Sequence, residues 1–410
     1  IISRHRMALK VLICGGGVAG PALAYWLARM GHQVVVIDRF PTLRATGAQI
    51  DLRGQGIEVV KRMGLIDAVR KKLVNEAGVS FIDAKGNVKA TILANKSGKG
   101  GQSFTSEYEI MRGDLVRIFY EATKDKVEYI FGKTVDGFTE NDRGVVAYFS
   151  DGSSDTFDLL VGADGQGSHI RRKILPPGAP DEYHQLGVHM AYWFVPRIET
   201  DSNMCQLYLS PGGRMIMSRS HNETETQVYF MLSSDTEELR NVPRGSVGQQ
   251  KHFWAQRFRD AGWQADRFIK GMDTTENWFC QNVVQIRTDT WHSGRVVLLG
   301  DAAHCPSPLS GMGTSTSLVG AYVLAGELAQ SEDLSQAFQN YSQIMRPFID
   351  QVQRLWIRWA LPNSQWQISL VHLIIRLACF LRIPQLISRF SDHGDGDWKL
   401  PEYPELKVFS

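Results

Sequence analysis

A glycine-rich turn between an apolar strand and a helix constrains the fold of this 410-residue chain more than any other feature. Residues 11–14 form a short apolar run, and Gly15, Gly17 and Gly20 follow it with the spacing G-x-G-x-x-G. The first glycine permits a tight turn, the second lets a pyrophosphate approach the main chain, and the third lets the helix pack closely on the strand. The pattern predicts a dinucleotide-binding βαβ unit.

The residues after this turn complete the βαβ pattern. Val18 and Ala19 finish the turn, and the helix that follows offers free N–H groups and a positive dipole end to phosphate. A second apolar strand, residues 34–37, ends at Asp38. A carboxylate at this place can accept hydrogen bonds from ribose hydroxyls. Strand, glycines, helix, strand and acid therefore occur in the order that a dinucleotide site requires.

A second motif lies near the other end of the chain. The apolar run at residues 296–299 leads into Asp301, then into a turn rich in proline and glycine, and then into a helix that starts near Thr314. We expect the strand to bring the Asp301 carboxylate to a sheet edge, where it can bind ribityl hydroxyls, and the helix N-terminus to stabilise negative charge on a reduced flavin. Two such motifs in one chain indicate FAD. The candidate cofactor residues here are Asp301, Pro308, Gly311, Gly313 and Thr314.

The pattern of apolar residues predicts more than one domain, as the length also does. Between about residues 180 and 290, aromatic and β-branched runs alternate with turns, which indicates a sheet inserted between two parts of the nucleotide domain. After Gly313 the spacing becomes helical. We therefore predict an α/β protein with a Rossmann-like FAD-binding domain, an inserted mixed β-sheet substrate domain and a C-terminal helical segment. The predicted boundaries are 8–175 and 291–330 for the FAD-binding domain, 176–290 for the substrate domain and 331–410 for the C-terminal helices and tail.

Composition argues against several other classes of protein. The formal net charge of +2 gives no indication of a nucleic-acid partner. The five cysteines are scattered and form no C-x-x-C pair, so we expect no metal site, no disulfide framework and a reducing compartment. Because no signal-peptide pattern is seen, we expect a cytoplasmic protein.

One apolar stretch, residues 368–380, leaves two interpretations open. It is interrupted by Arg376 and is shorter than the roughly 20 residues that a bilayer span needs. We expect burial against the two domains, and membrane contact is the less favoured alternative, through an amphipathic helix on the lipid surface.

A third motif, residues 164–171, has the form D-G-x-x-S-x-x-R and contains Asp164. Together, the three motifs resemble those of the group A FAD-dependent monooxygenases, the single-component aromatic hydroxylases similar to para-hydroxybenzoate hydroxylase. The resemblance covers roughly residues 8 to 360. Two looser stretches, residues 44–52 and 109–115, are most similar to the tetracycline-inactivating branch of that family.

The resemblance implies roles for individual residues. Arg44 would lie near the flavin ring, and Arg214 would contact the substrate from the inserted sheet. His189, Tyr192 and Met217 could line the same pocket, or could be ordinary sheet packing. The remaining residues that would bind or support FAD are Gly15, Gly17, Val18, Ala19, Gly20, Asp38, Arg39, Gly47, Asp51, Arg112, Leu115, Asp164, Asp301, Pro308, Gly311, Gly313 and Thr314.

The same resemblance implies a mechanism. NADPH would reduce FAD, the reduced flavin would react with O₂ to give a C4a-hydroperoxide, and one oxygen would pass to the substrate. No acid–base residue is required, and we expect the lone His304 to be structural. NADPH would bind transiently, because no second glycine motif is present.

The expected substrate is a bulky aromatic or polycyclic small molecule, such as a natural product or a tetracycline-like compound. We expect the enzyme to act as a monomer or loose dimer. Two alternatives remain open: a reductase of isoprenoid double bonds on the same scaffold, and a flavin-binding protein without catalytic turnover.

Overall fold

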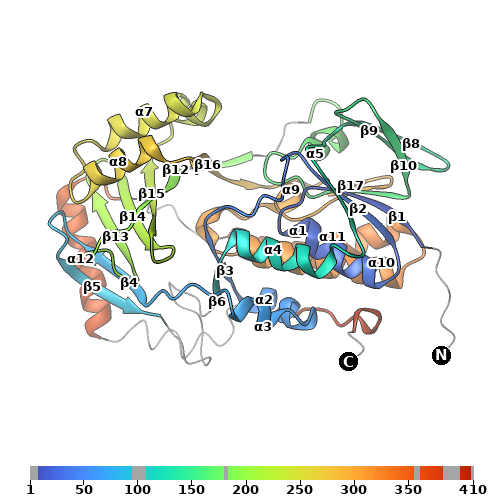
Figure 1. The fold of residues 1–410 in the computed structure, drawn as a ribbon, viewed down its shortest axis with the longest axis horizontal. Helices are drawn as coiled ribbons and strands as arrows, with labels where there is room; N and C mark the ends of the chain where they lie inside the picture. The colour runs from blue at the N-terminus through green and yellow to red at the C-terminus, as the bar shows by residue number, and fades with distance from the viewer. Residues whose placement is uncertain (1–7, 95–107, 180–182, 355–360, 382–397, 408–410) are drawn as a thin grey trace.

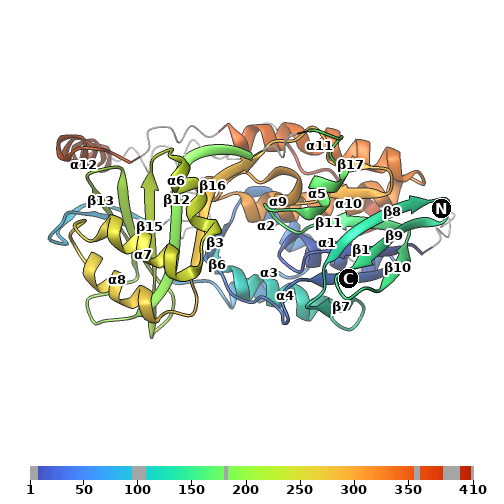
Figure 2. The same cartoon turned by 90° about the horizontal axis from the view of Figure 1, so that it is seen from above.

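The computed structural model describes residues 8–94, 108–179, 183–354, 361–381 and 398–407. Two large sheets lie at opposite ends of the molecule, and a short two-stranded ribbon lies between them (Figures 1 and 2). The ribbon consists of the antiparallel strands β3 (Gln49–Leu52) and β6 (Tyr108–Met111). The described residues are therefore arranged as two halves with a junction.

Six strands form the sheet of the first half: β1 (Lys10–Cys14), β2 (Gln33–Asp38), β7 (Glu128–Phe131), β11 (Leu159–Gly162), β17 (His292–Ser293) and β18 (Val296–Leu298). Their order is β17-β18-β11-β1-β2-β7, and every neighbouring pair is parallel except β17–β18. Val11, Leu12 and Ile13 have no exposed surface, as expected for a parallel sheet covered on both faces. The glycine turn follows β1 of this sheet, and the motif that contains Asp301 follows β18.

The helices of the first half are α1 (Ala19–Arg29), α2 (Gly54–Arg62), α3 (Ile66–Arg70), α4 (Arg112–Thr123), α5 (His169–Ile174), α9 (Asp301–His304), α10 (Gly313–Gln330) and α11 (Leu334–Gln353). α10 packs against α1, α2 and α11, and all of its residues from Ser315 to Leu328 are buried. Trp26 of α1 meets Tyr322 of α10 edge to face, with ring centroids 5.4 Å apart. A small antiparallel sheet completes this half, formed by β8 (Val135–Asn141), β9 (Gly144–Phe149) and β10 (Ser154–Phe157).

Seven strands form the sheet of the second half: β4 (Gly78–Ile82), β5 (Val88–Leu93), β12 (Tyr183–Pro196), β13 (Met204–Ser210), β14 (Arg214–Ser220), β15 (Glu225–Ser233) and β16 (Phe279–Ile286). Their order is β16-β12-β15-β14-β13-β4-β5. Helices α6 (Glu237–Asn241), α7 (Val247–Phe258) and α8 (Ala265–Thr274) belong to this half. Figure 2 shows α7 and α8 together on one side of the sheet. Alternate residues of β12, β14 and β15 pack on these helices, which leaves the intervening residues of these strands for the opposite face.

The predicted fold class is confirmed: the chain is a mixed α/β protein that combines a mostly parallel six-stranded sheet with a second, mixed sheet. The domain boundaries remain a prediction. The seven-stranded sheet takes β4 and β5 from within the range 8–175 that we assigned to the first domain, because β4 pairs in parallel with β13. The C-terminal segment 331–410 is described only in part.

The expectation that residues 368–380 are buried against the two domains was wrong. They form most of α12 (Gln365–Phe380), which runs along the outer edge of the second sheet beside β5 and β13 (Figure 1). Ile368 is buried, but Leu373 and Phe380 are 52% and 81% exposed. One side of the helix packs on a single sheet, so most of its apolar surface faces outward. Within the described residues, no helix has both the length and the apolar character needed to cross a membrane.

Candidate active site

A cavity of about 820 Å³ extends from the first motif to the inner face of the second sheet. Both halves and the ribbon contribute to its wall, so residues distant in sequence meet there. Sixteen of the predicted cofactor residues line it: Gly15, Gly17, Val18, Ala19, Asp38, Arg39, Arg44, Gly47, Asp51, Arg112, Asp164, Asp301, Pro308, Gly311, Gly313 and Thr314.

The first glycine turn is too tight for side chains. Gly15 has φ +123°, and a Cβ there would lie 2.2 Å from the carbonyl oxygen of Ala163. A Cβ on Gly20 would lie 2.0 Å from the carbonyl oxygen of Gly15. Gly20 does not line the cavity and instead allows α1 to approach β1. The turn therefore presents bare main chain at the start of a helix, the arrangement that binds pyrophosphate.

Asp38 fixes the same turn from the end of β2. Its Oδ2 accepts a hydrogen bond from the Gly16 N–H at 2.7 Å, and its Oδ1 accepts one from the Phe40 N–H at 2.9 Å. Each carboxylate oxygen has a further lone pair, so the side chain can still accept from ribose hydroxyls.

Arg112 reaches the glycine turn from the first turn of α4. Its Nη1 donates to the carbonyl oxygen of Thr46 at 3.1 Å, and its Nη2 would lie 3.2 Å from a Cβ on Gly17. Burial raises the pKa of the Asp301 carboxyl, and the positive charge of Arg112 opposes that rise. The guanidinium thus lies next to the glycine turn and acts electrostatically on Asp301 of the second motif.

A partly buried ion pair, Asp51 with Arg53, lies beside the second motif. Asp51 Oδ2 accepts a hydrogen bond from Arg53 Nη2 at 2.9 Å, and a Cβ on Gly311 would lie 3.3 Å from the same oxygen. Within the described residues, Asp51 Oδ1 and Arg53 Nε are buried without hydrogen-bond partners. Buried polar atoms are seldom left unsatisfied, so this pair fits a site that a polar ligand completes.

The third motif organises the loops around the cavity. Asp164 Oδ1 accepts from the Ser168 hydroxyl at 2.5 Å, and its Oδ2 accepts from the His169 N–H at 2.7 Å. Arg171 is fully buried and donates to the carbonyl oxygens of Gln166 and Ala302, each at 2.8 Å. The motif therefore joins the loop after β11 to α9, the short helix that follows β18.

An aromatic wall closes the far end of the cavity. Tyr192 stacks on Phe279 with ring centroids 4.5 Å apart, and on Tyr229 at 5.4 Å. The Arg44 guanidinium lies 5.3 Å from the Phe279 ring centroid and 4.6 Å from that of Phe40. Burial raises the pKa of Tyr192 to about 12, so this ring remains neutral at physiological pH.

Two of the four predicted substrate residues line this wall, Tyr192 and Met217, and two do not. Arg214 lies on the other face of β14, where its Nη1 donates to Asp260 at 2.6 Å and to the carbonyl oxygen of Arg257 at 2.9 Å. His189 lies on the other face of β12 and contacts Asn282 at 2.8 Å and the Ser234 carbonyl oxygen at 3.0 Å.

We therefore correct the assignments of Arg214 and His189, because strand alternation directs both side chains away from the cavity. Leu115 also needs correction as a cofactor residue. It has no exposed surface, belongs to the core of the first half and does not line the cavity.

Several residues of the second sheet line the cavity without having been predicted from the sequence. Arg219 follows Met215 and Met217 on the same face of β14, and Tyr229 and Met231 occupy the equivalent face of β15. Period-two alternation from Met217 was the signal that could have found Arg219. No local pattern pointed to Phe279 or Gln49, which reach the cavity only through tertiary packing.

No described group of three or more His, Cys, Asp or Glu side chains could hold a metal ion. His304 is buried beside Trp291 and Tyr341, and burial lowers its pKa to about 3. The residues of the cavity instead fit FAD: a side-chain-free turn at one end, unsatisfied polar atoms near the second motif and an aromatic wall beyond. Fold and cavity together define a dinucleotide-binding protein with an adjoining aromatic pocket.

Comparison with known proteins specifies the class further. The family described as "FAD binding domain" matches residues 8–355. The FAD-dependent monooxygenase asL4 of Sarocladium schorii is 39% identical over 424 residues, covering 97% of this chain and 99% of that protein. The solved structure of tetracycline destructase Tet(55) is similar with a TM-score of 0.79 and 29% identity, over 97% of this chain and 99% of that one. The chain therefore belongs to the FAD binding domain family and is an FAD-dependent monooxygenase.

Proposed function

We propose that this monooxygenase uses NADPH and O₂ to insert one oxygen atom into a bulky aromatic or polycyclic small molecule, such as a natural product or a tetracycline-like compound. The observation that carries the proposal is the continuity of the cavity, which joins the dinucleotide turn to an aromatic wall on the second sheet. Two solved relatives of similar fold are named tetracycline destructases, which supports a polycyclic substrate.

The proposed roles follow from position. Bound FAD would supply the redox chemistry, accepting hydride from NADPH and activating O₂. The turn from Gly15 to Gly17 and the Asp38 carboxylate would hold its ADP half, while Asp301 and residues 308–314 would hold the flavin end. Tyr192 and Phe279 would orient an aromatic substrate by stacking.

Exclusion of water is the second role of the second sheet. Met190, Met217 and Met231 present unbranched, polarisable side chains to the cavity. Such side chains adapt to a large apolar ligand and leave little room for solvent, which protects a reactive oxygen species from unproductive decay.

Oxygen labelling tests the proposal. Purified, FAD-loaded protein is incubated with NADPH under ¹⁸O₂ and a panel of phenolic and polycyclic compounds, tetracyclines included. We expect at least one compound to stimulate NADPH oxidation and to yield a product that carries one labelled oxygen. If protein from which FAD has been removed also formed the labelled product, the assignment of FAD as the cofactor would be contradicted.

The two alternatives predict other results in the same assay. A reductase of isoprenoid double bonds would give a product heavier by two hydrogens and free of label. A flavin-binding protein without turnover would retain FAD but show no stimulation of NADPH oxidation by any compound. Either result across a broad panel would overturn the proposed function.

A further inference from the structure

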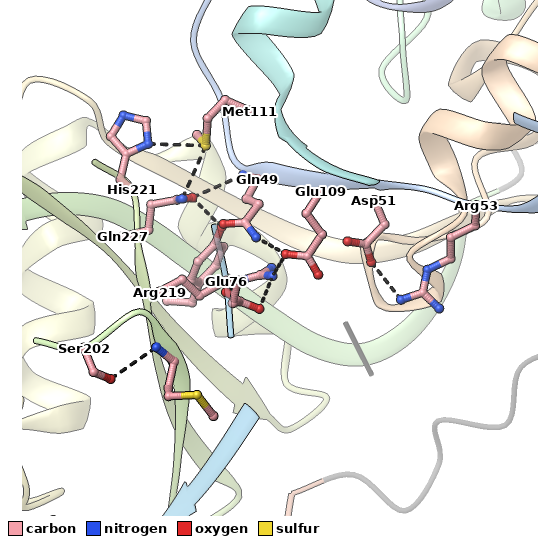
Figure 3. A network of polar contacts seen from close by, with 12 residues as sticks. Gln49, Asp51, Arg53, Glu76, Glu109, Met111, Ser202, Arg219, His221 and Gln227 are labelled. Atoms are coloured by element: carbon pink, nitrogen blue, oxygen red, sulfur yellow. Dashed lines mark hydrogen bonds and ion pairs between the residues drawn. The ribbon is translucent and has the colours of Figure 1, made fainter. Parts of the chain in front are cut away.

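A buried ion cluster lies behind the wall of the cavity, where the second sheet meets the ribbon. Figure 3 shows Arg219 of β14 between two carboxylates, Glu76 from the loop before β4 and Glu109 from β6. Arg219 Nε and Nη2 donate to the two oxygens of Glu76 at 2.8 and 2.9 Å, and Nη2 also donates to Glu109 Oε2 at 2.6 Å. Gln49 of β3 donates a further hydrogen bond to the same Glu109 oxygen.

The cluster holds Arg219 as a permanent cation. Burial by itself would lower the pKa of Arg219, but Glu76 and Glu109 outweigh it and raise that pKa well above the ordinary value. The Glu76 and Glu109 side chains are each 2% exposed, whereas Arg219 is 14% exposed and lines the cavity. The two carboxylates therefore lie behind the guanidinium as seen from the cavity.

Within the part of the chain that the structure describes, one nitrogen of Arg219 is left for a ligand. Glu76 and Glu109 occupy Nε and Nη2, and Nη1 has no acceptor among the described residues. A substrate carboxylate binds arginine best through two parallel hydrogen bonds, which need two free nitrogens on one edge of the guanidinium. With Nε and Nη2 engaged, Arg219 can offer only a single donor group to one oxygen atom.

The charge of the cluster also restricts which kind of ligand oxygen can bind to Arg219. One guanidinium and two carboxylates give the cluster a formal charge of −1. An anionic ligand oxygen would place a third negative charge around one cation in a poorly solvated site, where charge repulsion is strong. A neutral carbonyl or hydroxyl oxygen accepts the hydrogen bond without that cost.

We propose that Arg219 is a specificity-determining residue that donates through Nη1 to a neutral carbonyl or hydroxyl oxygen of the substrate, and that Glu76 and Glu109 position it and discriminate against anionic groups. The proposal rests on the proposed function, and it adds a substrate class: aromatic or polycyclic ketones and neutral phenols, rather than aryl carboxylates. Met217 lies two residues earlier on the same face of β14, so the oxygen would sit at the edge of the apolar wall.

Three rigid tricyclic probes test it: 9-fluorenone with a neutral carbonyl, fluorene with no oxygen, and fluorene-9-carboxylate. Their dissociation constants are measured from the change that each causes in the absorption spectrum of bound FAD, without turnover. Because one hydrogen bond to a charged donor changes affinity by about tenfold, we expect fluorenone to bind about tenfold more tightly than fluorene. The carboxylate should bind no more tightly than fluorene.

Three variants separate specificity from packing. Glu109→Gln leaves Arg219 paired with Glu76 and removes one negative charge, so we expect the carboxylate to gain about tenfold relative to fluorenone. Arg219→Gln combined with Glu76→Gln keeps the cluster at −1 and leaves Glu109 bonded to Gln49, and it should abolish the preference for fluorenone. Arg214→Gln, on the opposite face of the same strand, is the matched control and should leave all three affinities unchanged.

The outcomes distinguish the two proposals. If all three probes perturb the FAD spectrum but wild type shows no preference, or if Glu109→Gln does not change the preference, the role of Arg219 is overturned while the proposed function stands. If none of the probes perturbs the spectrum of the FAD-loaded protein, the aromatic cavity itself is not a substrate site and both proposals fail.

Discussion

At the scale of single residues, the buried His304 ring makes stability depend on pH. Its pKa is about 3 in the folded protein and close to 6.5 when exposed, so the unfolded chain binds a proton that the folded chain does not. The free energy of unfolding should therefore fall as pH decreases from 6.5 towards 3, by up to about 1.4 kcal/mol per pH unit from this group.

Urea unfolding at pH 7, 6 and 5 checks this expectation. Carboxylates shared by both proteins contribute equally, so the difference between wild type and His304→Gln isolates the histidine. We expect wild type to lose more stability than the variant as pH falls. Parallel curves would show that the pKa of His304 in the folded protein is close to its ordinary value and would contradict the expectation.

The glycines of the first turn allow a second test at the residue scale. A Cβ on Gly20 would meet the Gly15 carbonyl oxygen at 2.0 Å, whereas a Cβ on Gly248 of α7 would meet nothing within 4 Å. Gly20→Ala should displace the turn and lower the FAD content of the purified protein. Gly248→Ala should retain FAD and gain about 0.5–1 kcal/mol in stability, because alanine is the better helix former. Equal FAD content in both variants would contradict the role of the turn.

Which residues meet at the cavity could be predicted from the sequence where main-chain geometry decides it, although their cofactor roles remain a prediction. Gly15, Gly17 and Asp38 follow from a local strand–turn–helix pattern, and the structure brings them together at one end of the cavity. Arg214 could not be placed in this way, because a shift of one residue along a strand reverses the face of the side chain. Arg219, five residues later, lines the cavity in its place.

At the scale of elements, α12 shows that an apolar run in the sequence can give a wrong prediction of burial. Its hydrophobicity predicted burial, but its position depends on a contact with β5, which no local pattern encodes. Ile368 is 3% exposed and Leu373 is 52% exposed on the same helix. Ile368→Ala should lower the free energy of unfolding by about 2–3 kcal/mol, and Leu373→Ala by less than about 0.5 kcal/mol.

Chemical denaturation of the two variants measures this contrast. Both substitutions introduce alanine into the same helix, so their difference reports burial rather than helix propensity. A cost at Leu373 as large as that at Ile368 would mean that the outward face of α12 is covered in solution, contrary to the exposure seen here.

At the scale of the whole molecule, the division into two halves could be predicted, but the composition of the second sheet could not. β4 lies far from β13 in the sequence, and only their parallel pairing assigns β4 and β5 to that sheet. The ribbon of β3 and β6 likewise depends on a non-local pair, Gln49 with Met111. These contacts create the junction that the cavity occupies.

We expect one cavity to hold FAD, with its flavin end facing the aromatic wall and the substrate site between the two. A crystal structure of the FAD complex tests it most directly. We predict the pyrophosphate at the turn from Gly15 to Gly17 and the flavin ring between residues 308–314 and the Tyr192–Phe279 pair. A flavin ring bound outside this cavity, with the aromatic wall open to solvent, would contradict the account.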